Sequence, residues 1–349
     1  MLSLRQISIL CCTYLVLASC TSNSKNNSKS NLFQGIDSLI LSKQPHAFNG
    51  VVLISKGDSL LYHTTRGYAN FKQKDTLELN HQFVIGSISK QITAVLILQA
   101  YERGLLELTT PIAQYLPNLT MQWKDSINIH HLLTHKHGIQ SLDKALAFFP
   151  DSQFQYSQLG YELLAQILEQ VYQKSFLDIS TALFQEQHLT QTFHPQDKRF
   201  QNLVKGYTEN DQGTLVYEMH SFENYVPAGG FISTVQDLAK WNELLHSEKL
   251  LKQSTFQLMN TKYATRQHPI FDAIDYGYGL TFRANEQQIQ IGALGFAPGF
   301  VSSNFYFPAS NISLVILESV AANLDDFRQT FHYHTNIMKL TREALILNK

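Results

Sequence analysis

The sequence predicts a mixed α/β (α+β) fold, in which one antiparallel sheet is assembled from N- and C-terminal segments and flanked by helices. Near the N-terminus, β-type runs at 50–55 and 59–65 are separated by Lys56-Gly57-Asp58, which indicates a hairpin. Strand-like runs return near the C-terminus, at about 278–283, 287–292, 299–307 and 312–318. Between the two sets the apolar residues recur at helical spacing, which predicts an inserted all-helical lobe.

Helices are expected before, between and after these strands. The apolar spacing predicts them over 32–42, from 87 to about 102, through 163–171, from the cap Thr234 through Leu244, and over about 324–345. The region 175–226 has mixed helical and loop character. The turn Pro227-Ala228-Gly229-Gly230-Phe231 lets the backbone approach another element closely.

Length and composition fit a packed globular protein. With 349 residues and 44% hydrophobic content, the chain can bury a large core as one sizeable domain or two lobes. The formal net charge is -1 and no Lys/Arg-rich run is present, so the composition argues against a nucleic-acid partner.

The first twenty residues predict a targeting segment rather than part of the fold. Arg5 is followed by an apolar run at 7–17 that is short for a membrane span and suits a secretory signal. Its end, Leu17-Ala18-Ser19-Cys20, resembles a bacterial lipobox, in which the cysteine is acylated. An ordinary signal or a poor membrane helix is the alternative interpretation.

We therefore expect a lipoprotein signal peptide at 1–19, a polar tether at 20–31 after lipidated Cys20, and a folded domain at 32–349. The lipid anchor would make the membrane a partner and place the protein in the cell envelope, facing the periplasm or the outside. The other cysteines, Cys11 and Cys12, lie within the signal, so the domain has neither a structural disulfide nor a thiolate metal site.

Ser87 and Lys90 form the strongest candidate for catalysis. They stand three residues apart at the start of the predicted helix at 87–102, so their side chains share one face. A lysine in apolar surroundings has a lowered pKa and can take the proton of a serine hydroxyl. Ser-x-x-Lys also occurs at Ser22 and Ser141, in a polar tail and a loop, so the spacing alone leaves a chance occurrence open.

The stretch 130–138 is rich in histidine. His131 and His135 have helical spacing, which is compatible with a metal site, but no Asp or Glu lies within the stretch. Leu132 and Leu133 instead indicate a packed helix end. We therefore expect no metal and no organic cofactor.

Taken together, these motifs resemble the serine β-lactamase-like, penicillin-binding superfamily, which includes class C β-lactamases, D-Ala-D-Ala carboxypeptidases and related esterases. The segments that carry the resemblance are 83–94, 131–139, 154–164, 227–241, 276–280 and 292–300. The resemblance implies a β-lactamase-like fold. It also implies that Ser87 is the acylated nucleophile and that Lys90 and Tyr156 transfer its proton.

The second and third motifs of the superfamily depart from the usual pattern. Tyr156-Ser157-Gln158 has glutamine where the family has a substrate-binding asparagine; Gln158 either holds the substrate amide or is a solvated first-turn residue. In Gly292 to Phe300, Ala293 occupies the position of the basic residue, and Lys136-His137-Gly138 fits the pattern by coincidence, too early in the chain.

The oxyanion site implied by the resemblance uses backbone N–H groups of Ser87 and Phe296, beside Gly295, and these do not depend on side-chain identity. The sequence leaves open whether Arg266 or Arg283 replaces the base missing at Ala293. Because Ala293 cannot bind a substrate carboxylate as the basic residue would, the resemblance favours an esterase or weak peptidase over an efficient β-lactamase.

The sequence thus predicts an extracytoplasmic serine hydrolase acting on a small molecule or a peptide, including peptidoglycan-derived ones. The alternative is a catalytically impaired family member that binds a peptidoglycan-like ligand or a protein partner, or, outside the family, a structural lipoprotein. No Gly-x-Ser-x-Gly or His-Glu-x-x-His motif supports an α/β-hydrolase or a zincin.

Overall fold

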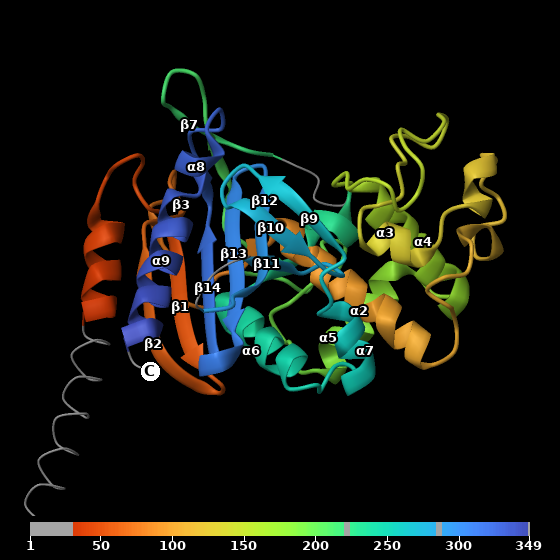
Figure 1. Ribbon diagram of the computed structural model, residues 1–349. Coiled ribbons are helices and arrows are strands. Elements are labelled where there is room, and N and C mark those ends of the chain that lie inside the picture. The colour runs from red at the N-terminus through yellow and green to blue at the C-terminus, as the bar shows by residue number, and fades with distance from the viewer. Residues whose placement is uncertain (1–30, 220–223, 284–287, 348–349) are drawn as a thin grey trace, which may run out of the picture.

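An eight-stranded antiparallel sheet forms the centre of the molecule (Figure 1). The computed structural model describes residues 31–219, 224–283 and 288–347. The strand order is β2-β1-β14-β13-β12-β11-β10-β9. Their bounds are β1 Gly50–Lys56, β2 Ser59–Arg66, β9 Ala264–His268, β10 Asp272–Tyr276, β11 Thr281–Arg283, β12 Ile291–Ala297, β13 Phe300–Phe307 and β14 Ile312–Glu318.

The two ends of the chain meet in this sheet, where β1 pairs with β14 in the register Val52↔Ile316. This pairing confirms the predicted sheet of N- and C-terminal segments.

The sheet is covered on both faces, because successive residues of its central strands point to opposite sides. Val52 and Ile54 pack with the helix at 31–41 and with α9 (His332–Leu347). Val51 and Leu53 pack on the opposite side, in the core that includes α2 (Ser89–Glu102) and α6 (Val235–His246). Figure 1 shows α9 and the N-terminal helix on one side and the helical lobe on the other.

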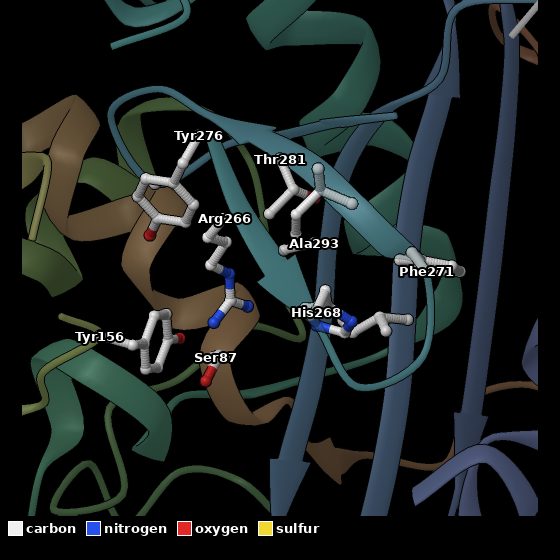
Figure 2. Close-up of a pocket in the computed structure, with 11 residues that line it drawn as sticks. Ser87, Tyr156, Arg266, His268, Phe271, Tyr276, Thr281 and Ala293 are labelled. Atoms are coloured by element: carbon white, nitrogen blue, oxygen red, sulfur yellow. The ribbon is translucent and has the colours of Figure 1, made fainter. Parts of the chain in front are cut away.

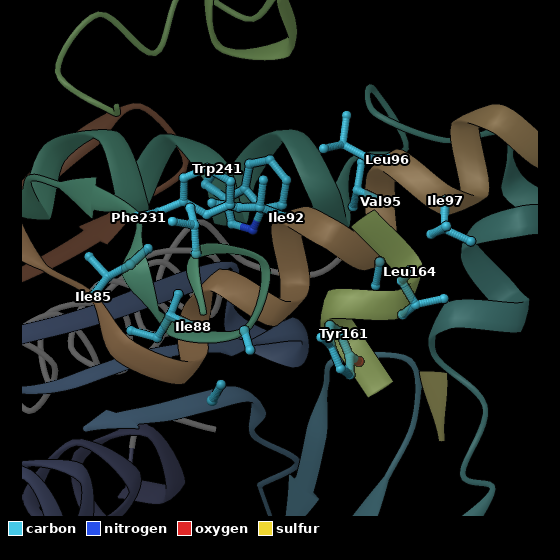
Figure 3. Close-up of a cluster of buried hydrophobic side chains, with 14 of the residues drawn as sticks. Ile85, Ile88, Ile92, Val95, Leu96, Ile97, Tyr161, Leu164, Phe231 and Trp241 are labelled. Atoms are coloured by element: carbon cyan, nitrogen blue, oxygen red, sulfur yellow. The ribbon is translucent and has the colours of Figure 1, made fainter. Parts of the chain in front are cut away.

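The inserted lobe is organised around α2, which is buried on nearly all sides (Figure 3). Polar residues of α2 are paired inside the core: Trp241 donates to Gln91 Oε1 at 3.1 Å, and the Thr93 hydroxyl donates to the Pro227 carbonyl at 2.7 Å. The other helices of the lobe and of its border with the sheet are α3 Ile129–Leu133, α4 Leu159–Tyr172, α5 Phe176–Glu186 and α7 Gln253–Met259.

Short elements connect the lobe to the sheet. Two small pairs are β3 (Tyr68–Asn70) with β4 (Asp75–Thr76), and β5 (Phe83–Val84) with β8 (Ile232–Ser233). A three-stranded sheet contains β15 (Val320–Ala321), β6 (Tyr207–Glu209) and β7 (Leu215–Tyr217). The single-turn helices are Gly86–Ile88, Ile112–Gln114, Gln122–Asp125, Val226–Gly230 and Pro308–Ser310.

Several predicted boundaries were wrong. The strand expected at 278–283 begins only at Thr281, because Gly277 donates to the Leu280 carbonyl in a turn and Gly279 has a φ of +69°. The strand expected to end near Gly292 starts at Ile291 and continues to Ala297. The single final helix is two helices, α8 (Phe327–Thr330) and α9, with Asp326 capping α8.

The predicted signal peptide, Cys20 with its predicted lipidation, and most of the predicted tether lie outside the described residues. Asn31, the last residue of the predicted tether, belongs to the first helix. Among the residues that the structure does describe, no helix combines the length and the apolar character needed to cross a membrane.

Candidate active site

Ser87 lies in a tight turn between β5 and α2. The turn, Gly86–Ile88, is a 3-10 helix that leads directly into α2, so the predicted helix start near Ser87 is confirmed to within two residues. Gly86 has a φ of +53°, and a Cβ there would lie 2.5 Å from the Phe296 nitrogen. Only glycine allows β12 to approach the serine turn this closely.

Lys90 is buried beneath the serine and is only 1% exposed. Its Nζ lies 3.5 Å from Ser87 Oγ, and it donates to Gln158 Oε1 and to the Ala228 carbonyl, both at 2.7 Å. Burial lowers the pKa of Lys90, with a smaller opposing effect from Tyr156.

This geometry suits a neutral amine, which has two N–H bonds and one lone pair. The two short contacts end on carbonyl oxygens, of Gln158 and Ala228, and these can only accept hydrogen bonds. The lone pair then remains for the third direction, towards Ser87 Oγ. Because burial also favours the uncharged form, Lys90 is arranged to accept the serine proton.

Tyr156 borders the same space. Its ring centroid is 4.6 Å from Lys90 Nζ and 5.1 Å from the guanidinium carbon of Arg266, so two basic side chains lie against one aromatic ring. The structure therefore brings Ser87, Lys90 and Tyr156 together, although 66 residues or more separate the tyrosine from the helix residues in the chain.

His135 holds the segment that carries Tyr156. Its carbonyl accepts from Gln155 N at 2.9 Å and its Nδ1 accepts from Ser157 N at 3.2 Å, so both neighbours of Tyr156 are bound to one residue. Its Nε2 is 3.0 Å from the Tyr276 hydroxyl. Burial lowers the pKa of His135 well below its ordinary value, which is consistent with a neutral ring that accepts from Ser157 N.

The other histidines of this stretch also have packing roles. His131 completes a capping box with Asn128 at the start of α3, and His137 Nδ1 accepts from Ile139 N. Within the described residues, no three His, Cys, Asp or Glu side chains gather as metal ligands. Lys136 pairs with Asp151 at 2.5 Å within the helical lobe, away from the strand that faces Ser87.

Gln158 has a role that the sequence did not show. Its Oε1 accepts a hydrogen bond from Lys90 Nζ at 2.7 Å, although the residue itself is exposed at the start of α4. The carbonyl is thus engaged, and the side-chain NH₂ has no partner within the described part of the chain.

The strand β12 supplies the opposite wall. A Cβ at Gly295 would lie 2.2 Å from both the Ile85 carbonyl oxygen and Ser302 Oγ, so β12 packs directly on the residues before Ser87. The Phe296 nitrogen is next to this turn, where the oxyanion donor was expected. Ala293, three residues before Phe296, lines the Ser87 pocket with a small apolar side chain.

Arg266 lines the Ser87 pocket from a strand other than β12. The sequence had left open whether Arg266 or Arg283 takes this place. Arg266 lies on β9, and the pocket is lined by Ser87, Tyr156, Arg266, His268, Phe271, Ile274, Tyr276, Gly279, Thr281, Ala293 and Leu294 (Figure 2). Arg283 is not among these residues and packs on the Phe271 ring at 5.2 Å. Sequence reasoning missed His135, Tyr276 and the strands β9 and β10, because their positions depend on tertiary contacts.

The beta-lactamase family model matches residues 40–337. The chain belongs to the beta-lactamase family. Among characterised relatives in this family, penicillin-binding protein 4* of Bacillus subtilis is 26% identical over 301 residues, with 71% of this chain and 62% of the relative covered. The teichoic acid D-alanine hydrolase of Staphylococcus aureus is 25% identical over 288 residues, with 77% of this chain and 70% of the relative covered. The chain therefore spans less than two thirds of the first relative.

Solved structures agree on the β-lactamase-like fold. The octameric penicillin-binding protein homologue from Pyrococcus abyssi aligns with a TM-score of 0.75 and 24% identity, covering 87% of this chain and 77% of that one. The D-amino acid amidase from Ochrobactrum anthropi aligns with a TM-score of 0.76 and 19% identity, covering 93% and 98%. The family match and these structures therefore agree on one fold.

Proposed function

We propose that this protein is an extracytoplasmic serine hydrolase that works through an acyl-enzyme on Ser87. The observation that carries the proposal is the position of the Lys90 amine, which donates to Gln158 Oε1 and to the Ala228 carbonyl at 2.7 Å and lies 3.5 Å from Ser87 Oγ. A serine hydroxyl needs such a base before it can attack a carbonyl carbon.

The proposed reaction has two halves. Ser87 Oγ forms a bond to the substrate carbonyl carbon while its proton passes to Lys90, and the negative charge on the carbonyl oxygen is stabilised by the N–H groups of Ser87 and Phe296. The proton then passes to the departing alcohol or amine, with Tyr156 beside Lys90 as the second member of the proton-transfer pair. A water molecule then attacks the carbonyl carbon of the acyl-enzyme in the same way. The bond to Ser87 Oγ breaks, the proton returns to Ser87, and the acid is released.

The names of the relatives narrow the substrate class. One is named for penicillin binding and the other for hydrolysis of D-alanine on teichoic acid, a cell-envelope polymer. We infer that the chain acts on an ester or amide of a small acyl group, of D-alanyl type. This inference fits the small pocket beside Ser87, which Tyr156 and Arg266 help to line.

Covalent labelling tests the nucleophile. The mature chain is treated with a fluorescent fluorophosphonate and, separately, with a fluorescent penicillin. We expect labelling of the wild type and no labelling of Ser87→Ala. Ser141→Ala is the matched control, because Ser141 also stands three residues before a lysine, in a loop, and its loss should leave labelling unchanged. A folded wild type that neither probe labels would support the non-catalytic binding protein instead.

The location follows from Cys20 and is tested separately. Cys20→Ala should abolish lipid incorporation and move the protein from the membrane to the soluble fraction of cells that express the full chain. Cys12→Ala, within the same predicted signal, should leave both unchanged. Unchanged membrane association of Cys20→Ala would exclude the lipid anchor.

A further inference from the structure

Arg266 reaches the Ser87 pocket through the edge of the sheet. It pairs with Ile274 of β10, which pairs in turn with Arg283 of β11. Directly paired residues of adjacent strands point to the same face, and Ile274 lines the pocket. In Figure 2 the Arg266 guanidinium points between Tyr156 and Ser87, below Ala293.

The charge of Arg266 has no carboxylate partner among the described residues. Its buried Nε–H donates to no described acceptor, and its guanidinium carbon lies 5.4 Å from the Phe154 ring centroid and 5.1 Å from that of Tyr156. Two other arginines of the described chain, by comparison, have carboxylate partners: Arg199 with Asp197 and Arg328 with Asp272. A partly buried guanidinium without an anion is costly, so its retention beside the nucleophile points to an anion supplied by the ligand.

The space beside this guanidinium fits a small anion. The pocket has a volume of about 30 Å³, room for roughly two water-sized groups. A carboxylate has two oxygens, which matches this room. Ala293 is 5% exposed and adds only a methyl group here, so its small size leaves the room that Arg266 and the ligand share.

We propose that Arg266 binds a carboxylate of the ligand in the Ser87 pocket, and so supplies from β9 the positive charge that the motif position Ala293 lacks. The proposal rests on the proposed function, because it concerns the same pocket. It names the substrate class more closely: an ester or amide that carries a free carboxylate near the reacting carbonyl. The planar guanidinium can engage both carboxylate oxygens, which an isolated ammonium does less specifically.

Boronic acids test this without knowledge of the substrate. The boron of phenylboronic acid accepts an electron pair from Ser87 Oγ while the serine proton passes to Lys90, which gives a reversible tetrahedral adduct. The 3- and 4-carboxyphenylboronic acids differ from it by one carboxylate. Their affinities are measured by protection of Ser87 against fluorophosphonate labelling, at low and at high ionic strength.

For the wild type we expect at least one carboxylated compound to bind about tenfold or more tightly than phenylboronic acid, and the advantage to shrink with salt. Arg266→Gln should reduce the ratio to near one and leave phenylboronic acid nearly unaffected. Arg266→Lys keeps a charge and should keep part of the ratio. Arg283→Gln, two strands away in the same row, is the matched control and should keep all of it.

Four results would overturn the proposal. Equal binding of all three compounds by the wild type, or an undiminished ratio in Arg266→Gln, shows that no carboxylate is recognised there. Equal weakening of all three in Arg266→Gln shows that the residue only positions Tyr156. If the wild type binds no boronate and takes no fluorophosphonate, the proposed function fails and this inference falls with it; boronate binding without carboxylate preference refutes this inference alone.

Discussion

Replacing Lys90 with methionine separates its catalytic role from its structural one. Methionine has a similar length and no donor, so Ser87 loses its base while the buried volume is nearly kept. General-base catalysis is worth about a hundredfold to ten-thousandfold in rate. We expect the rate of fluorophosphonate labelling at Ser87 to fall by that amount in Lys90→Met.

The cost in stability can be worked from the contacts of the amine. Lys90 donates to the buried Ala228 carbonyl and to Gln158 Oε1. Gln158 is exposed and can turn to water, so only the Ala228 carbonyl loses its partner. One unsatisfied buried acceptor costs about 1–3 kcal/mol, and the removal of a desolvated amine offsets part of it. The free energy of unfolding should therefore fall by no more than about 3 kcal/mol.

Labelling kinetics and urea denaturation measure the two effects on the same samples. Lys262→Met is the control, because Lys262 lies on the surface, paired with Asp275 at 2.9 Å, and should change neither. Tyr156→Phe and the double variant complete a cycle. If Lys90 and Tyr156 act as one proton-transfer unit, the double variant is little slower than Lys90→Met. Labelling of Lys90→Met at the wild-type rate would refute the assignment of Lys90 as the base.

Two further predictions concern buried carboxyl groups. Burial raises the pKa of Glu162 to about 7, and the negative charge of Glu162 acts to raise the pKa of Lys90. Glu162→Gln removes that charge and lowers the pKa of Lys90. The acidic limb of the labelling pH profile should therefore shift to lower pH. Glu318 is fully buried between His334 (3.0 Å) and His46 (3.5 Å); burial acts to raise its pKa, but these contacts outweigh it and leave the pKa lowered. Stability from a lowered carboxyl pKa is present above the ordinary value and is lost as pH falls, so wild-type unfolding free energy should drop in acid, and Glu318→Gln should cost about 3–5 kcal/mol at neutral pH.

Exposed glutamates provide the controls for both. Glu186→Gln, at the end of α5, should leave the labelling profile in place, and Glu343→Gln, which removes a surface contact with Lys339, should change stability by less than about 1 kcal/mol. A labelling profile unmoved by Glu162→Gln would mean that Lys90 does not control the acidic limb. A Glu318→Gln protein as stable as the wild type would mean that this buried cluster does not tie α9 to the sheet.

The parts of the fold that the sequence predicted are those whose signal is local. The strand β14, expected at 312–318 and found at Ile312–Glu318, is mainly apolar because both its faces are covered. Ser87 and Lys90 are three residues apart at a helix start, so their proximity follows from helix geometry alone. By contrast, β9 and β10 are short, carry several polar residues and lie at the sheet edge, and their sequences do not differ from loops.

The candidate site was predicted less completely because its charges are set by tertiary contacts. His135 binds both neighbours of Tyr156, a role that its helical spacing with His131 does not indicate. Gln158 binds Lys90 because α4 begins next to α2. Arg266 enters from a strand that the sequence did not predict at all.

Ala293 shows why a motif position cannot be judged alone. Catalysis and binding need a positive charge at a place in space, and a sequence motif records only one of the chain segments that can deliver it. Here the segment at the motif position contributes a methyl group and a close backbone, whereas Arg266 of β9 lies in the same pocket as Ser87. A substitution such as alanine for a basic residue therefore predicts lost function only when no other cation lines the same pocket, and in this protein one does.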